Sequence, residues 1–187
     1  MEQLGAISLT DQLFFDTDCI SAFLWVGKQS ILSKLYPNKI RIPKQVYAEL
    51  SYPGVSHLKE RVDTLIRNGD AKIVDIEANS DDYDFYTELT CDPKDGKKSI
   101  GKGEAACIVF ARKENGIIAS NNLRDIDFYV KEYNLKHKTT GDIMVDAVSL
   151  GIITEEQANK LWDAMIRKRR KLGADTFSSY LKNHNSF

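Results

Sequence analysis

A short apolar run near the start of the chain, residues 13–15 (Leu-Phe-Phe), is followed directly by Asp16, Thr17 and Asp18. Such an abrupt change from apolar to acidic residues is typical of a buried strand with functional side chains at its carboxyl end. In open α/β sheets, ligands bind outside the carboxyl ends of the parallel strands. The run therefore predicts an α/β fold in which Asp16 stands at the edge of the sheet where a site would form.

The composition narrows the class of protein. The chain has 187 residues, 42% hydrophobic and 28% charged, which suits a globular protein of about one domain. The net charge of −1 does not demand a nucleic-acid partner, although a local basic face would suffice for one. Three widely spaced cysteines disfavour a disulfide framework and a structural zinc site. No signal peptide or membrane span is recognised, so we expect a cytoplasmic soluble protein.

Strand-like and helix-like apolar patterns alternate along the chain. Strands are expected over residues 13–15, 40–42, 71–76, 116–120 and, as a fifth, 136–140. Helices are expected over 20–35 (one or two), 45–50, 57–67, 79–89, 104–113, 125–133, 141–150 and from 154 onward. Pro43 suits the first position of its helix, and Thr154 suits the N-cap of the last long one.

This alternation predicts the architecture. Strands separated by helices form a mostly parallel sheet with helices on both faces, because parallel crossover connections need a helix. We therefore expect a three-layer α/β/α domain with four to five strands over residues 10–151. A C-terminal helical extension over residues 152–187 would pack on this domain or serve as an arm.

Four carboxylates fall where this fold would bring them together. Asp16 follows the first strand, Glu49 lies on the helix after the second, Glu104 begins the helix before the fourth, and Asp125 lies just beyond the fourth. Like charges at close range raise each other's pKa, and a divalent cation would relieve their repulsion. Oxygen ligands suit Mg²⁺ or Mn²⁺, which polarise a phosphodiester and generate hydroxide near neutral pH. The acids thus point to nuclease chemistry.

The segments that carry these acids resemble the PIN-domain nucleases, especially the toxin-like ribonucleases of prokaryotic toxin–antitoxin pairs. The resemblance covers roughly residues 13–151. Its marks are, in chain order, residues 14–18 with Ser21, then 42–50, 101–106, 117–125 and 139–143. The order and spacing of these marks are more specific than any one of them.

The resemblance implies a hydrolase: a metal-dependent endoribonuclease that is the toxin of a toxin–antitoxin pair. Asp16, Glu49, Glu104 and Asp125 would be catalytic around Mg²⁺ or Mn²⁺. Asp16, as the central ligand, would bind the metal together with Glu104 and Asp125. The implied partners are an RNA substrate, an antitoxin protein and a second copy of the chain, with no membrane partner.

The resemblance also suggests weaker candidates for contacting substrate, namely Thr17, Ser120, Asn122 and Lys102. Thr17 and Ser120 could orient water or phosphate. The chain departs from the family pattern at two positions. Glu104 stands where many members have Asp, and Asn122 stands where many have an acid, a charge that Asp125 could supply instead.

Other interpretations stay open. Each acid also has a structural interpretation. Asp16 could cap the strand end, Glu49 could be a solvated helix residue, Glu104 could interact favourably with the dipole of its helix, and Asp125 could cap the next helix. A non-catalytic binding module that keeps the fold is a second function, and the departures at Glu104 and Asn122 motivate it. Residues 16–18 with Ser120 also resemble haloacid dehalogenase-type phosphatases, but no paired Asp follows Ser120 at a strand end.

Two basic segments have alternative uses. Residues 96–103 nearly match a phosphate-binding loop, but Gly103 replaces the required Ser or Thr. The lysines of this region could contact RNA phosphates or simply be solvated; they are Lys94, Lys97, Lys98 and Lys102. Residues 167–171 are all basic and follow a helix whose apolar face includes Trp162, Met165 and Ile166. That run is either a solvated helix end or an arm for RNA backbone or an acidic partner.

Overall fold

The computed structural model describes residues 11–93 and 98–184. Five strands form one parallel sheet in the order β3-β2-β1-β4-β5. They are β1 (Leu13–Phe15), β2 (Ile40–Pro43), β3 (Ala71–Val74), β4 (Ile117–Ala119) and β5 (Lys136–Lys138). Leu13 is the central register point, opposite Ile40 on one side and Ile117 on the other. The predicted parallel sheet is confirmed, with its fifth strand.

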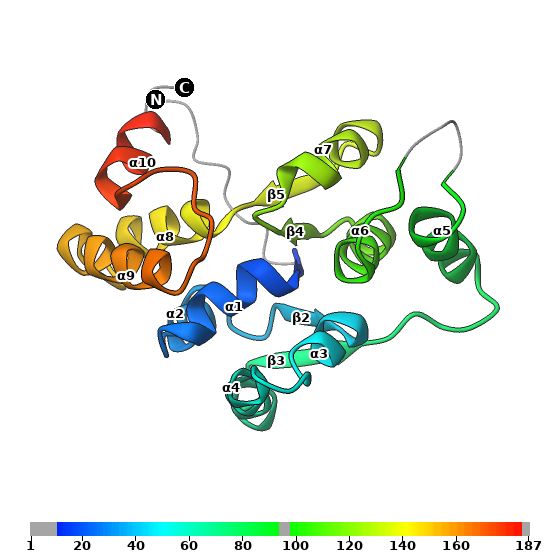
Figure 1. The fold of residues 1–187 in the computed structure, drawn as a ribbon, viewed down its shortest axis with the longest axis horizontal. Coiled ribbons are helices and arrows are strands. Elements are labelled where there is room, and N and C mark those ends of the chain that lie inside the picture. Colours follow the sequence, from blue (N-terminus) through cyan, green and yellow to red (C-terminus); the bar gives the residue numbers. More distant parts are fainter. Residues whose placement is uncertain (1–10, 94–97, 185–187) are drawn as a thin grey trace.

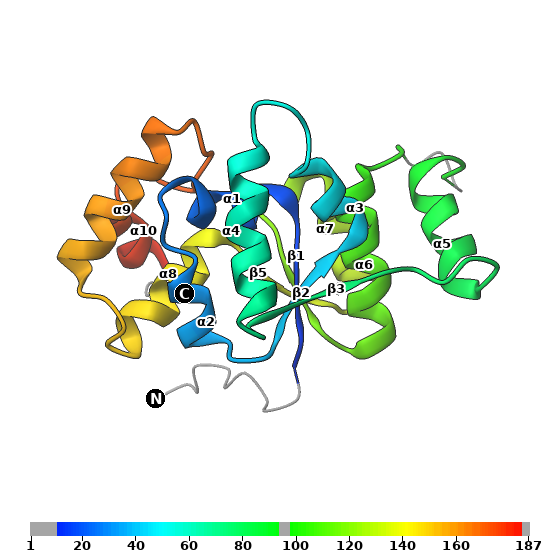
Figure 2. The same ribbon diagram turned by 90° about the horizontal axis from the view of Figure 1, so that it is seen from below.

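The sheet separates two hydrophobic cores. Leu13 and Phe15 of β1 pack into one core and Phe14 packs into the other, because side chains of a strand point alternately to its two faces. The helices that contribute to the first core are α1 (Thr17–Trp25), α2 (Ser30–Leu35), α3 (Lys44–Glu49), α4 (Ser56–Arg67), α8 (Thr140–Ser149), α9 (Glu155–Arg167) and α10 (Phe177–His184). The second core is covered by α5 (Asp81–Thr90), α6 (Lys102–Glu114) and α7 (Leu123–Glu132). Figure 2 shows these layers, so the three-layer α/β/α fold is confirmed.

Some boundaries differ from the expected ones. Pro43 is the last residue of β2 and the N-cap of α3 (Lys44–Glu49), not its first helical residue, because its ψ of 142° keeps the backbone extended. The apolar segment 20–35 forms two helices, since Gly27 at φ +65° ends the first one. Asp125 is not the N-cap of α7. Asn122 occupies that position without a side-chain hydrogen bond to the helix backbone, and Asp125 lies in the first turn.

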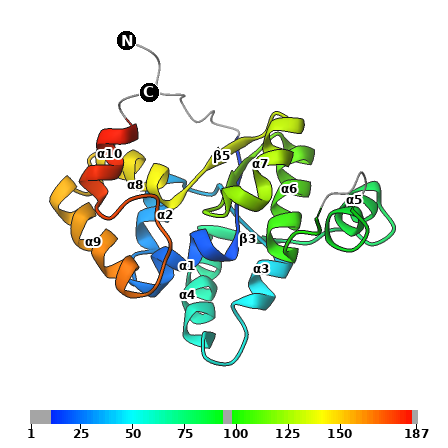
Figure 3. The same ribbon diagram turned by 45° about the horizontal axis from the view of Figure 1, so that its top comes forward.

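The C-terminal helices pack against the sheet-covering helices. Trp162, Met165 and Phe177 are fully buried in the first core, and the indole N–H of Trp162 donates to the Ala174 carbonyl at 2.9 Å. Ile166 is 38% exposed, so the expected apolar face of α9 is narrower than its sequence suggested. Figures 1 and 3 show α10 beside α8 and α9, at the end of the molecule opposite α5. Thr154 caps α9 as predicted, in a capping box with Gln157.

Some expectations concern residues that the structure does not describe. Lys94 and Lys97, residue 96 of the near phosphate-binding loop, residue 10 of the expected domain and residues 185–187 of the extension lie outside the described residues. Among the helices within the described ranges, none is long and apolar enough to cross a membrane.

Candidate functional site

Asp16 lies where the strand order reverses direction. β1 has β2 on one side and β4 on the other, and such switch points form ligand-binding crevices at the carboxyl ends of the strands. These ends point upward in Figure 2, where β1 leads into α1. The backbone N–H of Asp16 donates to the Ala119 carbonyl at 2.9 Å, which ties the end of β1 to the end of β4.

The Asp16 side chain is held on both oxygens and is only 2% exposed. Its Oδ1 accepts from the Cys19 backbone N–H at 2.7 Å, so Asp16 is the N-cap of α1. Its Oδ2 accepts from the Ser120 hydroxyl, which comes from the end of β4. The structural alternative for Asp16, a capping role, is therefore present in this fold. It coexists with a position at the centre of the switch point.

The environment of Asp16 penalises its charge. Burial raises the pKa of Asp16 to about 7, against the lowering effect of the hydrogen bonds from Ser120 and the Cys19 backbone. The negative charges of Glu104 and Asp18 raise it further. A carboxyl group with such a pKa holds a proton or pairs with a cation near neutral pH. Strongly perturbed carboxyl groups of this kind gather at functional sites.

Glu49 faces the same region from the end of α3. The Thr17 hydroxyl donates to Glu49 Oε2, so Thr17 positions Glu49 through a direct bond. Burial raises the pKa of Glu49, and the charge of Glu104 raises it further. Gly103 allows the start of α6 to approach: a Cβ there would lie 3.5 Å from Glu49 Oε1 and 3.2 Å from a methyl group of Val46.

Asn122 links the remaining two acids. Its amide donates to Glu104 Oε1 at 3.2 Å and to Asp125 Oδ2 at 2.7 Å. Its backbone N–H donates to the Ser120 hydroxyl at 3.1 Å, which connects this pair to Asp16. The amide at this position therefore bridges two carboxylates that an acid would repel. Lys102, the fourth residue named as a weak substrate contact, is exposed in the first turn of α6.

The acids are joined through these side chains and do not form a tight ligand cage. Across residues 11–93 and 98–184, no group of three or more His, Cys, Asp or Glu side chains is close enough to hold a metal ion directly. The carboxylates at the switch point nevertheless offer only oxygen atoms as metal ligands. The negative charge of Glu104 raises the pKa of both Asp16 and Glu49, so the acids are close enough to affect one another. Mg²⁺ keeps several waters and takes only one or two carboxylates. The donor chemistry thus fits a hydrated divalent cation.

Two side-chain contacts near the site were not predicted from the sequence. Asn121 and Thr140 exchange hydrogen bonds of 2.9 and 2.8 Å, which fasten the end of β4 to the start of α8. Arg170 reaches α1 from the C-terminal basic run, with its guanidinium 3.3 Å from Asp18 Oδ1 and 3.2 Å from Ser21 Oγ. A run of five basic residues gives no indication of which one will make such a contact.

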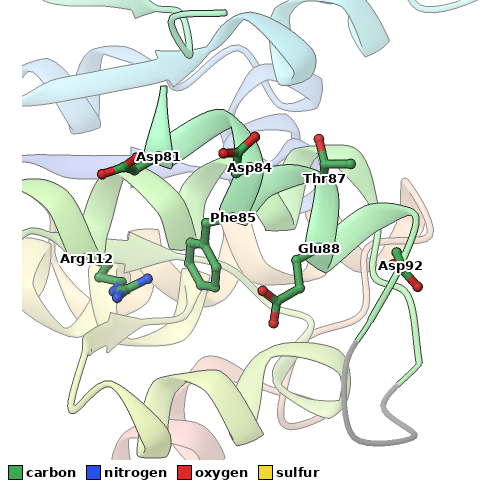
Figure 4. Close-up of a pocket in the computed structure, with 7 residues that line it drawn as sticks. All are labelled: Asp81, Asp84, Phe85, Thr87, Glu88, Asp92 and Arg112. Carbon is green, nitrogen blue, oxygen red and sulfur yellow. The ribbon is translucent and has the colours of Figure 1, made fainter. Parts of the chain in front are cut away.

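A separate hollow of about 510 Å³ lies along α5, and none of the candidate acids lines it (Figure 4). Its lining residues are Asp81, Asp84, Phe85, Thr87, Glu88, Asp92 and Arg112. The Arg112 guanidinium lies 4.6 Å from the centre of the Phe85 ring and 4.7 Å from that of Tyr133. A wall with four acids and one engaged cation has the wrong charge for nucleic acid.

Comparison with known proteins agrees with this geometry. No curated protein matches the chain, and no solved structure matches it. A protein-family model described as DUF3368, PIN domain, matches residues 12–186, which include all four candidate acids. PIN domains are generally nucleases, a class of hydrolases. The predicted resemblance to PIN domains is thus confirmed, and the chain belongs to the PIN-domain family DUF3368.

Proposed function

We propose that this protein is a metal-dependent endoribonuclease that hydrolyses RNA phosphodiester bonds with Mg²⁺ or Mn²⁺. One observation carries the proposal: Asp16 is buried at the switch point with its pKa raised to about 7, and Glu104 contributes to that rise. The capping role of Asp16 does not require a buried negative charge, because a neutral Asn caps a helix equally well, whereas a cation-binding site does require one. A cation-binding role for Asp16 agrees with membership of the PIN-domain family, whose members are generally nucleases.

The side chains divide the work. Asp16, Glu104 and Asp125 would hold the cation, which polarises the phosphate and activates a water molecule when bound. Ser120 fixes Asp16 Oδ2, and the Asn122 amide orients the carboxylates of Glu104 and Asp125.

Glu49 is suited to take up a proton during the reaction, because its raised pKa brings it closer to neutral pH. Thr17 holds Glu49 in place for this purpose. Lys102, exposed in the first turn of α6, would contact an RNA phosphate.

The resemblance to toxin-like members extends the proposal. The protein would act as a toxin in the cytoplasm, as a homodimer, with an antitoxin protein as its inhibitor. Residues 10–151 would form the nuclease domain, and residues 152–187 would form its helical extension. Induced expression of the wild-type chain should then arrest growth, and expression of Asp16→Asn should not. Equal growth of both strains would remove the toxin role and leave the nuclease proposal untouched.

The direct test is cleavage of a mixed pool of structured RNAs by purified protein. We expect cleavage with Mg²⁺ or Mn²⁺, none with EDTA, and none by Asp16→Asn. Asp163→Asn is the matched control, because Asp163 is an exposed residue of α9 that pairs only with Arg167 among the described residues. Cleavage that persists in EDTA, or in Asp16→Asn, would refute the proposal.

A second candidate function is a non-catalytic module that binds RNA or protein. It is favoured by the lack of a tight group of three metal-binding side chains in the described ranges and by the amide at Asn122. Calorimetric titration with Mn²⁺ separates the two functions, because the nuclease requires binding that Asp16→Asn weakens. The phosphatase alternative is less supported, since both oxygens of Asp16 accept hydrogen bonds and the side chain is buried. Turnover of a generic phosphate ester, lost in Asp16→Asn, would restore it.

A further inference from the structure

A pocket of about 410 Å³ opens beside the candidate acids, between the segment that precedes α6 and the outer face of α7. Two of its lining residues connect it to the acids. Gly101 lies directly against Glu104, because a Cβ on Gly101 would overlap the Glu104 carboxylate. Asp125 shares the Asn122 amide with Glu104. The pocket therefore lies next to the acids that are proposed to carry the reaction.

One wall of the pocket is aromatic. Phe128 is 51% exposed, and its ring makes an edge contact with Tyr129 at a centroid distance of 5.3 Å. Tyr129 is buried and stacks on Tyr133, so the side chain that supports the Phe128 ring is itself held in place. Single-stranded nucleic acids are bound by exposed aromatic rings on which their bases stack.

The pocket also presents positive charge. Lys98 and Arg124 line it, and both are exposed. Within the part of the chain that the structure describes, neither has an ion-pair partner, whereas the nearby Lys131 pairs with Asp127 at 2.6 Å. The one acid of the lining, Asp125, is engaged by the Asn122 amide. Unpaired cations next to an exposed ring suit a phosphate and its base.

We propose that this pocket binds one nucleotide of single-stranded RNA next to the phosphate that is cleaved. The base stacks on Phe128, and the adjoining phosphate contacts Arg124 and Lys98. A duplex cannot use the pocket, because its bases already stack on one another and do not present a free face. The inference rests on the proposed function for the position of the cleaved phosphate. It adds a position for a base at Phe128, a residue outside the acids.

Binding is measured by fluorescence anisotropy with a labelled single-stranded RNA of mixed sequence, in Mg²⁺, on the full chain carrying Asp16→Asn so that the probe stays intact. Adding Phe128→Ala should weaken binding about 10-fold, and Phe128→Trp should retain it. Phe128→Leu keeps an apolar side chain without a stacking ring and should resemble Phe128→Ala. Tyr83→Ala is the matched control, since Tyr83 is an exposed aromatic residue of α5 and does not line the pocket.

Two further probes test the chemistry. An oligonucleotide of the same length without bases should bind the parent and Phe128→Ala alike, and a duplex of the same sequence should compete poorly. Arg124→Gln should lessen the salt dependence of binding by about 0.7 in log–log slope, the value for one phosphate of a single strand. Binding by Phe128→Ala within twofold of the parent, or equal competition by the duplex, would overturn the inference.

The two proposals fail in different ways. If the nuclease proposal is wrong, the wild type will not cleave RNA with either metal, while Phe128-dependent binding persists. If the pocket is wrong, the wild type and the Phe128→Ala chain will cleave at the same rate and the binding of single-stranded RNA will not depend on Phe128. If Phe128→Ala and the parent unfold at the same temperature, a binding defect of the variant does not come from loss of the fold.

Discussion

The charged and aromatic residues on the two sides of the candidate acids have different partners. One side, the α1 flank, consists of α1 and the C-terminal residues 168–170 that contact it; the other, the α7 flank, consists of α7 and residues 98–101. On the α1 flank, Arg170 pairs with Asp18, and the Lys168 ammonium lies 5.5 Å from the centre of the Trp25 ring. On the α7 flank, Arg124 and the half-exposed Phe128 face a pocket, and no described ion pair engages Arg124. On the α1 flank, Arg170 and Lys168 hold the C-terminal segment to the domain, whereas on the α7 flank Arg124 and the exposed part of the Phe128 ring line a pocket.

This difference shows that the density of positive charge in the sequence is a poor guide to a binding surface. The five consecutive basic residues at 167–171 are the strongest charge signal of the chain, yet Arg170 contacts the protein itself. Arg124 lies between Leu123 and Asp125, and no basic cluster in the sequence marks it as part of a binding surface. The neighbours of each cation in the fold decide whether it is available.

The largest contrast should be in stability. Trp162→Ala should lower the free energy of unfolding by about 3–5 kcal/mol, because it removes a fully buried indole from the first core. Phe128→Ala should change it by less than about 0.5 kcal/mol, since half of that ring is already in solvent. Urea unfolding of both variants measures the two values. Similar losses for both would mean that the α7 flank is as structural as the C-terminal one.

Asp16 lies between the flanks, and its stability effect should depend on pH. Its pKa is about 7 in the folded protein and 3.8 as a free side chain, so the folded state holds a proton that the unfolded state releases between these values. Without metal, the free energy of unfolding should therefore fall as pH rises from about 4 to 7, by an amount on the order of a few kcal/mol.

Asp16→Asn should abolish this pH dependence while keeping the fold, because Asn is as good an N-cap as Asp. Urea unfolding in EDTA at pH 5 and pH 8 measures the effect, and Asp163→Asn should retain the wild-type behaviour. Marked unfolding of Asp16→Asn would instead show that the charged carboxylate is needed for the fold.

Gly101→Ala should separate activity from stability on the α7 flank. The new methyl group would displace the end of the Glu104 side chain, which is flexible, while the backbone angles of Gly101 (φ −61°, ψ 152°) suit alanine. We expect RNA cleavage to fall about 10- to 100-fold, because small shifts of a catalytic group are costly. The free energy of unfolding of Gly101→Ala should change by less than about 1 kcal/mol. Lys102→Ala should also leave the free energy of unfolding unchanged, because Lys102 is exposed. A stable, fully active Gly101→Ala protein would argue against a role for Glu104.

The smallest effects should distinguish the two arginines. Arg170→Gln should lower the free energy of unfolding by up to about 1 kcal/mol, the range of partly exposed ion pairs, and leave the salt dependence of RNA binding unchanged. Arg124→Gln should lessen the salt dependence of RNA binding and leave the free energy of unfolding unchanged. A flatter salt dependence for Arg170→Gln would mean that the α1 flank also binds RNA.

Much of this arrangement could be predicted from the sequence. Short apolar runs between helical patterns determine a parallel sheet, and the abrupt end of the first run at Asp16 located the carboxyl edge. Asn122 could not be interpreted in the same way, because its two carboxylate partners come from different helices. The contact between Arg170 and Asp18 joins residues 152 positions apart, which no local pattern encodes. Phe128 and Tyr129 are adjacent aromatic residues, and only the packing of α7 decides that the first is exposed.

The central position of β1 determines the order in which the candidate site is assembled during synthesis. β1 is made first, yet one of its two neighbours, β4, is made more than one hundred residues later; Ser120 follows Asp16 by 104 positions. At roughly 5–20 residues per second, a ribosome needs about 5–20 s to bridge that interval. During this time Asp16 has neither Ser120 nor the Asn122-linked acids beside it. In the proposed nuclease, the acids that would hold the cation therefore come together only after β4 and the first turn of α7 have been translated.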